Sequence, residues 1–278
     1  MLAAYVFNNV RTLLMSNLGP KYDPVTGTGT VGRNYCYQTG GGGASGWFTG
    51  QKFKRYMGSG ALSMAIDDFN ADNFNHADVG FIRGSQISVG TGNLEGGPIS
   101  LTTTAPPSGV PRWGAAYRDF LAKYYARHAA MVAQTENLPY ADQTIDLDPN
   151  VRDAWGLPAP RMTYDWRRPN EVKRVEYVNN KLLEIGRATG AAHVWTAPAS
   201  PGAPGSHHQG GVRMGHNPRD SVVNKYGQTW DIPNLFVLGS ANFPTSAGFN
   251  PTLTIQALSY MTADAIVNKY KKNPGRLI

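Results

Sequence analysis

The clearest periodic pattern of hydrophobic positions lies near the C-terminal end of the chain, over residues 250–270. Apolar side chains recur there at the spacing of one face of an α-helix. They are Leu258, Met261, Ala265 and Ile266. Asn250 is a favoured residue for the N-cap position, and Pro251 suits the first helical position. The pattern predicts a helix that begins at Pro251, with capping as the ordinary role of Asn250.

The same helical period predicts two longer helices in the middle of the chain. One covers residues 113–132, which carry a broad apolar stripe, and the other covers residues 169–190, which end at Gly190, a common stop residue. The apolar face of the second helix consists of Val175, Val178, Leu182 and Ile185. Near the N-terminus, we predict a short strand or turn over residues 2–9 and a helix over residues 10–17.

Short β-favouring segments separated by glycine occupy much of the remaining chain, and they favour an antiparallel sheet. We predict strands within residues 47–57, 76–89, 97–103, 131–139, 161–166 and 234–239. The glycine run TGGGGASG, residues 39–46, is interpreted as a flexible or tightly bent loop. The antiparallel strands together with the helices predict an α+β fold.

Candidate chemistry begins with two adjacent histidines, His207 and His208, which precede Gly210 and Gly211. Glycines allow the backbone to turn tightly, and imidazole is the side chain best matched to proton transfer near neutral pH. Two alternatives stay open. One is a structural role, and the other is a metal site with His216 as a third ligand, although adjacent histidines lack the spacing of a helical zinc pair.

Composition narrows the class of protein. A chain of 278 residues with 41% hydrophobic and 11% aromatic residues is globular, with one large or two modest domains. The net charge of +7 comes without a Lys/Arg block or an RNA-binding motif, so it predicts a solvated basic surface and no nucleic-acid partner. A single cysteine, Cys36, excludes an internal disulfide and a cysteine-ligated iron–sulfur cluster in this chain. No apolar run reaches the roughly 18 residues of a membrane span.

A glycine motif near the N-terminus resembles a nucleotide-binding loop. Gly27, Gly29 and Gly32 have the G-x-G-x-x-G spacing of a dinucleotide-binding loop. The residues before them are polar, and RNYCYQ follows in place of a helix, so the required strand–loop–helix context is missing. We therefore interpret these glycines as a turn.

Several segments carry a resemblance to a known family. They are VGRNYCYQ, SMAIDDFNADNFNHADVGF, AQTENLPYADQTIDLDPNVRDAWGLP, MTYDWRRPNE and SHHQGGVRMG, followed by the Asn-Pro step. On these motifs the chain resembles the GMC (glucose-methanol-choline) flavoprotein oxidoreductases. It is most similar to the large FAD subunit of membrane-bound gluconate 2-dehydrogenase and to the related sorbitol, fructose and glucose dehydrogenases. The resemblance runs over nearly the whole chain.

The resemblance implies a catalytic pair and a cofactor site. His207 and Asn250 occupy the positions of the family's pair, because the family turn places its histidine three residues before the first of two glycines. His208 fits that position less well. The positions that correspond to FAD contacts are Gly239, Ser240, Ala241, Pro251 and Thr252. A helix that starts there would direct its partial positive charge at the flavin edge.

The resemblance also implies a division into domains. Residues 1–34 would be the tail end of the FAD-binding part, residues 35–205 an antiparallel substrate-binding domain, and residues 206–278 the return to the FAD-binding domain. The N-terminal Rossmann portion of the family lies outside this sequence. We expect exposed apolar surface where that portion would pack.

The implied activity is FAD-dependent oxidation of a CH–OH group in a sugar, a sugar acid or a polyol such as gluconate. Electrons would pass to a cytochrome-type acceptor. The relatives' partners are a small exported subunit and a cytochrome c subunit, at the periplasmic side of the inner membrane. The alternative is a non-catalytic fragment or interaction domain that retains the fold without turnover.

Overall fold

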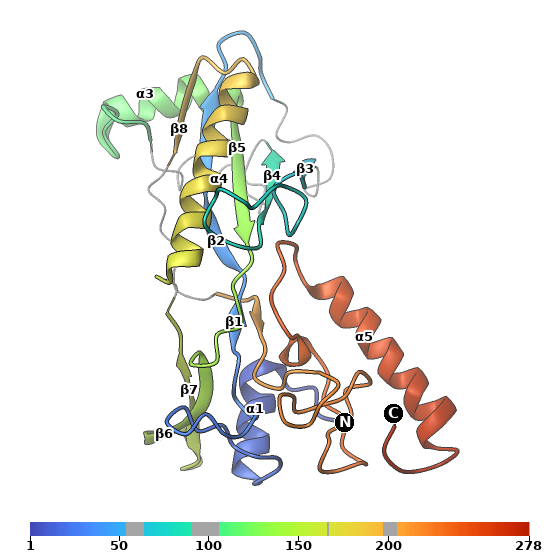
Figure 1. Cartoon of the computed structure of the whole chain (residues 1–278). Coiled ribbons are helices and arrows are strands. Elements are labelled where there is room, and N and C mark those ends of the chain that lie inside the picture. Colours follow the sequence, from blue (N-terminus) through green and yellow to red (C-terminus); the bar gives the residue numbers. More distant parts are fainter. Residues whose placement is uncertain (54–63, 91–105, 166, 197–204, 278) are drawn as a thin grey trace. The chain divides into compact units, whose positions relative to one another are not determined.

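The computed structural model describes residues 1–53, 64–90, 106–165, 167–196 and 205–277 of the chain. They form two compact units (Figure 1). The terminal unit, named for the first and last segments that it contains, comprises Met1–Gln38, Glu136–Trp166 and Ala203–Ile278. The sheet unit comprises Thr39–Thr135 and Arg167–Gly202. Both units are assembled from segments that are far apart in the sequence.

The sheet unit contains a five-stranded antiparallel sheet in the order β3-β4-β5-β2-β8. Its strands are β2 (Thr39–Trp47), β3 (Met64–Ile66), β4 (Ser85–Gly90), β5 (His128–Thr135) and β8 (His193–Thr196). Helix α4 (Pro169–Ala188) runs along this sheet (Figure 1). Val178 and Leu182 of α4 share a buried core with Ala44, Ile87 and Met131 of the strands. The predicted combination of helices with an antiparallel sheet is confirmed.

Helix α4 agrees closely with the prediction for residues 169–190. Pro169 lies in its first turn, and Val175, Val178 and Leu182 are each at most 2% exposed. Gly190 follows the helix with a φ of +76°, a backbone conformation that glycine adopts at little cost. The strong apolar period and the proline and glycine at the two ends all favoured this helix.

The glycine run over residues 39–46 was wrongly predicted to be a loop. It is part of β2, which pairs with β5 on one side and with β8 on the other. Two backbone ladders provide hydrogen bonds whatever the side chains are, so tertiary pairing overrides the low strand propensity of glycine. The run also permits close packing, because a Cβ at Gly46 would lie 3.1 Å from the Ala191 Cβ.

The predicted helix over residues 113–132 is wrong in its second half. Helix α3 (Gly114–Tyr124) is followed by the 3₁₀ turn η1 (Tyr125–Arg127), and β5 begins at His128. The apolar period continues into β5, whose buried positions alternate as they do in a half-buried strand. Pairing with β4 and β2 therefore decided the conformation of this segment.

The terminal unit packs one helix against short strands and turns. Its elements are α1 (Tyr5–Met15), β1 (Cys36–Tyr37), β6 (Thr144–Arg152), β7 (Pro158–Thr163), β9 (His208–Gln209), η2 (Ser240–Asn242), α5 (Thr252–Ala265) and the π-helical turn η3 (Ile266–Tyr270). Helix α1 buries Val6, Val10 and Leu13 in the core of this unit. It begins at Tyr5, so the predicted strand or turn over residues 2–9 is largely wrong.

The remaining strand predictions in the terminal unit hold in part. Strand β7 overlaps residues 161–166, and its partner β6 was not predicted. Residues 234–239 form isolated bridges, such as Leu2 with Val237, in place of a regular strand. Gly27 lies in a turn closed by a bridge between Asp23 and Thr28, and Gly29 follows that bridge. Residues 30–38, all described, contain no helix, which confirms the interpretation of the glycine motif.

Helix α5 confirms the C-terminal prediction with a shift of one residue. It begins at Thr252, so Pro251 and not Asn250 occupies the N-cap position, without a side-chain cap. On its predicted apolar face Ala265 is buried, Leu258 and Ile266 are partly buried and Met261 is 38% exposed. Leu253 and Tyr260, which lie on another side of the helix, are each 79% exposed. Asn250 is therefore free of the capping role that the sequence suggested for it.

The compact units divide the chain differently from the predicted domains. Residues 136–166, predicted within a substrate-binding domain over residues 35–205, belong to the terminal unit. The backbone explains this placement, because the Tyr35 N–H donates to the Gln143 carbonyl and the Ile145 N–H donates to the Gly32 carbonyl. The assignment of functions to the predicted domains remains a prediction.

Two buried side chains, Asn224 and Gln228, make hydrogen bonds that hold the C-terminal tail. Gln228 is fully buried, donates from Nε2 to the carbonyls of Pro233 and Gly275, and accepts the Leu277 N–H at Oε1. We expect Gln228→Met to lower the free energy of unfolding by about 2–4 kcal/mol, because one buried and two partly buried backbone groups lose their partner. Urea titration measures this, and Gln51→Met, on an exposed residue, is the control.

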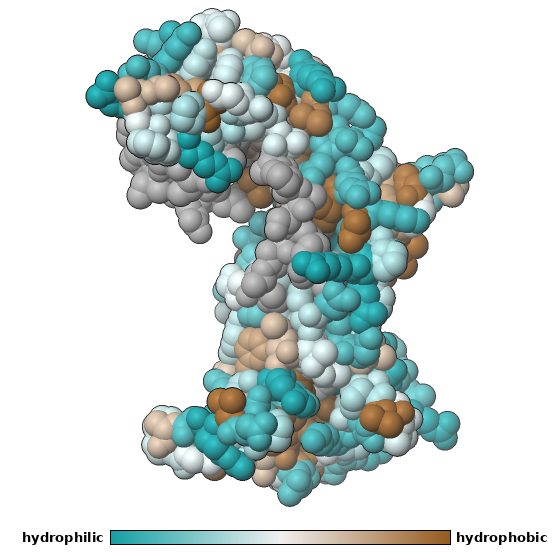
Figure 2. Space-filling model, turned by 90° about the vertical axis from the view of Figure 1, so that its left-hand side faces the viewer, coloured by the Kyte–Doolittle hydropathy of each residue, from teal (hydrophilic) through white to brown (hydrophobic). Residues whose placement is uncertain are grey.

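The surface is mainly hydrophilic on the face drawn in Figure 2, where hydrophobic residues form separate patches. Among the exposed apolar side chains of the terminal unit are Trp155 at 84% and Val151 at 55%. Within the described ranges, no helix combines the length and the apolar composition that crossing a membrane requires.

Candidate active site

The two histidines lie at the edge of a short antiparallel pair of strands in the terminal unit. Strand β9 pairs with β1, so that His208 lies opposite Tyr37 and Gln209 opposite Cys36. One step further, the Gln38 N–H donates to the His207 carbonyl at 3.4 Å. Backbone hydrogen bonds between the two strands therefore fix the main chain at His207, but they do not fix its imidazole.

His208 is fixed by hydrogen bonds at both ring nitrogens. Its Nε2 lies 2.7 Å from the Gly205 carbonyl oxygen, which only accepts, so Nε2 carries the proton and donates. The Tyr35 hydroxyl lies 2.6 Å from His208 Nδ1 and donates its own proton to that nitrogen. Aromatic rings of Tyr5, Phe7 and Tyr37 surround the imidazole. His208 is 7% exposed, and both of its ring nitrogens are engaged in hydrogen bonds. It therefore fits the structural role that the sequence left open.

His207 differs from its neighbour in each of these respects. It is half-buried, and its imidazole makes no hydrogen bond to the part of the chain that the structure describes. Burial lowers the pKa of His207 below its usual value, which keeps the ring neutral near pH 7. A neutral imidazole with a free nitrogen is able to accept a proton from a ligand.

The glycines after the histidines pack the turn against the N-terminal segment. Gly210 and Gly211 have φ values of +80° and +84°, as expected for a tight turn. A Cβ at Gly210 would overlap the Asn34 carbonyl oxygen, and one at Gly211 would lie 2.7 Å from Val10 Cγ2. This packing sets the direction in which the two histidines leave the turn.

The predicted cofactor-binding turn lies directly beside the histidine turn. Ser240 Oγ donates to the His208 carbonyl at 2.7 Å, and the N–H groups of Gly210 and Val212 donate to the carbonyls of Ser240 and Ala241. The side chains of Ser240 and Ala241 are consequently buried. Gly239 is different, because a Cβ there would meet no atom within 4 Å and its φ is +104°. At Gly239 the backbone itself borders open space.

Asn250 lies in the exposed segment that leads to α5. Its side chain makes no hydrogen bond to the described residues, and none joins it to His207. Pro251 is buried, whereas Thr252, the first residue of α5, is exposed. The structure thus places the histidine turn and the Gly239–Ala241 turn in contact, and leaves Asn250 linked to them only through other residues.

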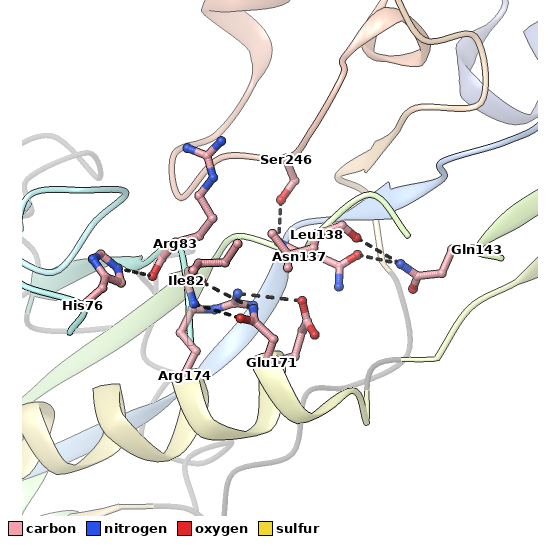
Figure 3. A network of polar contacts seen from close by, with 10 residues as sticks. His76, Ile82, Arg83, Asn137, Leu138, Gln143, Glu171, Arg174 and Ser246 are labelled. Carbon is pink, nitrogen blue, oxygen red and sulfur yellow. Dashed lines mark hydrogen bonds and ion pairs between the residues drawn. The ribbon is translucent and has the colours of Figure 1, made fainter. Parts of the chain in front are cut away.

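The residue that makes this link, Gln38, was missed in the sequence, as was Asn137, which attaches the same segment elsewhere. The Gln38 side chain donates from Nε2 to the Ala247 carbonyl at 2.7 Å. The Ser246 hydroxyl accepts the Asn137 N–H at 2.7 Å, and Gln143 in turn donates to the Leu138 carbonyl at 3.2 Å (Figure 3). Gln38 ends the segment VGRNYCYQ, in which a polar residue after buried ones was the available signal.

The other candidate groups lie outside this arrangement. His216 is exposed on a loop that lines a hollow together with Arg213 and Lys225. Among the described residues, no three His, Cys, Asp or Glu side chains are grouped as a metal site. Burial raises the pKa of the Cys36 thiol to about 12, so this cysteine stays protonated.

Burial of both histidines predicts a pH-dependent stability. Burial is the largest cause that lowers the pKa of each imidazole. The folded state therefore binds protons more weakly than the unfolded state, whose histidines titrate near about 6.5. We expect the histidines' contribution to the free energy of unfolding to be constant above that pH, to fall as the pH is lowered from there to the depressed folded pKa values, and to level off below them. Urea titrations between pH 8 and pH 5 test this, and His207→Gln with His208→Gln should flatten the dependence.

This fold and site define a class of protein. Residues 139–259 match the family model of the GMC oxidoreductases. The chain belongs to the GMC oxidoreductase family, which confirms the resemblance found in the sequence.

Relatives within the family cover different shares of the chain. The chain is 36% identical over 285 residues to the gluconate 2-dehydrogenase flavoprotein of Pantoea cypripedii, a match that covers 100% of the chain and 46% of the relative. It is 38% identical over 144 residues to the fructose dehydrogenase large subunit of Gluconobacter japonicus, covering 50% of the chain and 25% of the relative. The chain thus spans less than half the length of these relatives.

The fold is also found among solved structures. A formate oxidase from Aspergillus oryzae RIB40 superimposes with a TM-score of 0.59 at 15% identity, over 98% of this chain and 54% of that one. At this identity the likeness concerns the fold alone.

Proposed function

We propose that this chain carries the catalytic histidine and part of the cofactor site of an FAD-dependent dehydrogenase that oxidises a CH–OH group. The observation that carries the proposal is the difference between the two histidines. His208 is bonded at both nitrogens, and His207 offers a neutral imidazole without a partner among the described residues. Membership of the GMC oxidoreductases and likeness to a gluconate 2-dehydrogenase flavoprotein support the reaction class.

The Gly239–Ala241 turn fits a flavin cofactor. Its side chains are turned inward, so a ligand would meet the backbone, and the open space at Gly239 admits close approach. Pro251 and Thr252 begin α5, whose first N–H groups favour negative charge. Bound FAD would supply the acceptor for the hydride that leaves the oxidised carbon.

The residues of this chain have separate tasks in the proposed reaction. An imidazole nitrogen of His207 accepts the proton of the substrate hydroxyl. The side-chain amide of Asn250 makes a hydrogen bond to the same oxygen and orients it. The lowered pKa of His207 keeps it in the form that accepts a proton, so activity should require a pH above that pKa.

The substrate, the partners and the location follow from the relatives and belong to the proposal. A sugar, a sugar acid or a polyol such as gluconate is the substrate class, supported by the gluconate and fructose dehydrogenases among the relatives. One of these is named as a large subunit, which supports a multi-subunit assembly. We propose that its other members are a small exported subunit and a cytochrome c subunit, the latter as electron acceptor. We propose that such an assembly works at the periplasmic side of the inner membrane.

A titration with FAD, followed by flavin fluorescence, tests the cofactor site. We expect saturable binding that Gly239→Val weakens, because its side chain would occupy the open space beside the turn. Gly27→Val is the matched control, since Gly27 also has a positive φ and open surroundings but lies in the turn near the N-terminus. Equal loss in both variants would contradict the site. Absence of binding to the parent chain would favour a fragment without turnover.

A further inference from the structure

Gln38 joins the two segments that carry His207 and Asn250. Its backbone N–H donates to the His207 carbonyl, and its side-chain Nε2 donates to the Ala247 carbonyl, three residues before Asn250. The Gln38 side chain is 3% exposed, and its bond to Ala247 is partly buried. All of these residues belong to the terminal unit.

The segment before α5 has few other polar attachments. Within the described part of the chain, residues 244–250 make two hydrogen bonds, one from Gln38 to Ala247 and one from Asn137 to Ser246. The second bond fixes the segment to residues 136–143 (Figure 3) and not to the histidine turn. Gln38 is therefore the direct polar link between the segment and the strand pair that holds His207.

The chemistry of the side chain suits this link. Only the amide nitrogen of Gln38 is used, while its Oε1 is buried and has no partner among the described residues. An unpaired buried oxygen costs free energy. A methionine of similar size would avoid that cost but would lose the hydrogen bond to Ala247. The Nε2 donor is therefore the property that glutamine has here and methionine lacks.

We propose that Gln38 is a positioning residue that holds the segment of residues 244–250 in register with the His207 turn. It acts on Asn250 through the Ala247 carbonyl and touches neither the substrate nor the cofactor. The proposal rests on the proposed function for its catalytic meaning, since it concerns the same His207 and Asn250. The attachment of the segment is a separate physical statement that is measurable without FAD.

A spin label at Asn250→Cys measures the attachment. The label reacts selectively there, because the single native cysteine, Cys36, is fully buried and its pKa is about 12. We expect Gln38→Met to shift the nitroxide spectrum to faster motion. Gln228→Met is the matched control, because it also removes a buried amide donor to backbone carbonyls, at the C-terminal tail. An unchanged spectrum in Gln38→Met overturns the proposal.

A double-mutant cycle on flavin reduction by gluconate tests the catalytic consequence in the FAD-loaded protein. Gln38→Met should lower the rate at saturating substrate, and it should cause no further loss when Asn250→Ala is already present. Equal loss in both backgrounds would overturn action through Asn250. If Asn250→Ala leaves the rate unchanged, the proposed role of Asn250 is wrong, and the spin label still decides whether Gln38 holds the segment.

Discussion

Replacing His207 with alanine should slow the reduction of bound flavin by substrate about 100- to 10,000-fold, the usual contribution of a general base. The half-buried, neutral imidazole without a hydrogen-bond partner among the described residues is the reason for this expectation. Stopped-flow absorbance of the flavin in a single turnover measures the step directly, before any later electron transfer.

His208→Ala is the matched control, because it removes the same kind of side chain one residue away. It should lower the free energy of unfolding by about 1–3 kcal/mol, since the Tyr35 hydroxyl and the Gly205 carbonyl lose a buried partner. Flavin reduction should fall much less than in His207→Ala once the samples are compared at equal folded fraction. Loss of reduction in His208→Ala with normal reduction in His207→Ala would reverse the assignment.

The second large effect is expected at Gly210. Alanine there must adopt a φ near +80°, which costs about 1–2 kcal/mol, and its Cβ would overlap the Asn34 carbonyl oxygen. Displacing backbone in a packed region adds about 1–3 kcal/mol. We therefore expect a loss of about 2–5 kcal/mol in the free energy of unfolding, measured by urea titration.

Gly27→Ala separates backbone strain from packing. Gly27 has a φ of +70°, and nothing lies within 4 Å of a Cβ built on it. Its replacement should show the strain alone, about 1–2 kcal/mol. If both alanine variants were destabilised equally, close packing of the histidine turn against residue 34 would contribute nothing, contrary to the structure.

Local chemistry made part of this structure predictable. Helix α4 has an apolar period, a proline at its start and a glycine after its end, and these signals act within a few residues of one another. The glycines after His207 and His208 likewise predicted a tight turn, because positive φ values are a property of glycine itself. The family resemblance depended on such local motifs.

Other features depended on partners distant in the sequence. Strand β2 contains the glycine run, and it forms because β5 and β8 lie on both of its sides. Strand β5 ends the predicted helix early for the same reason. The sequence cannot show which backbone will pair with which, so these segments were predicted from propensities that tertiary pairing overrode.

By itself, the sequence determined the α+β class, the α4 helix, the histidine turn and the residues that resemble the GMC motifs, because each of these follows from side-chain type and short-range spacing. Only the tertiary structure decided that His208 is bonded at both nitrogens while His207 is not, and that Gln38 links the His207 turn to the segment before α5. Those distinctions depend on Tyr35, Gly205 and Ala247, whose positions relative to these side chains arise from folding and not from their order along the chain.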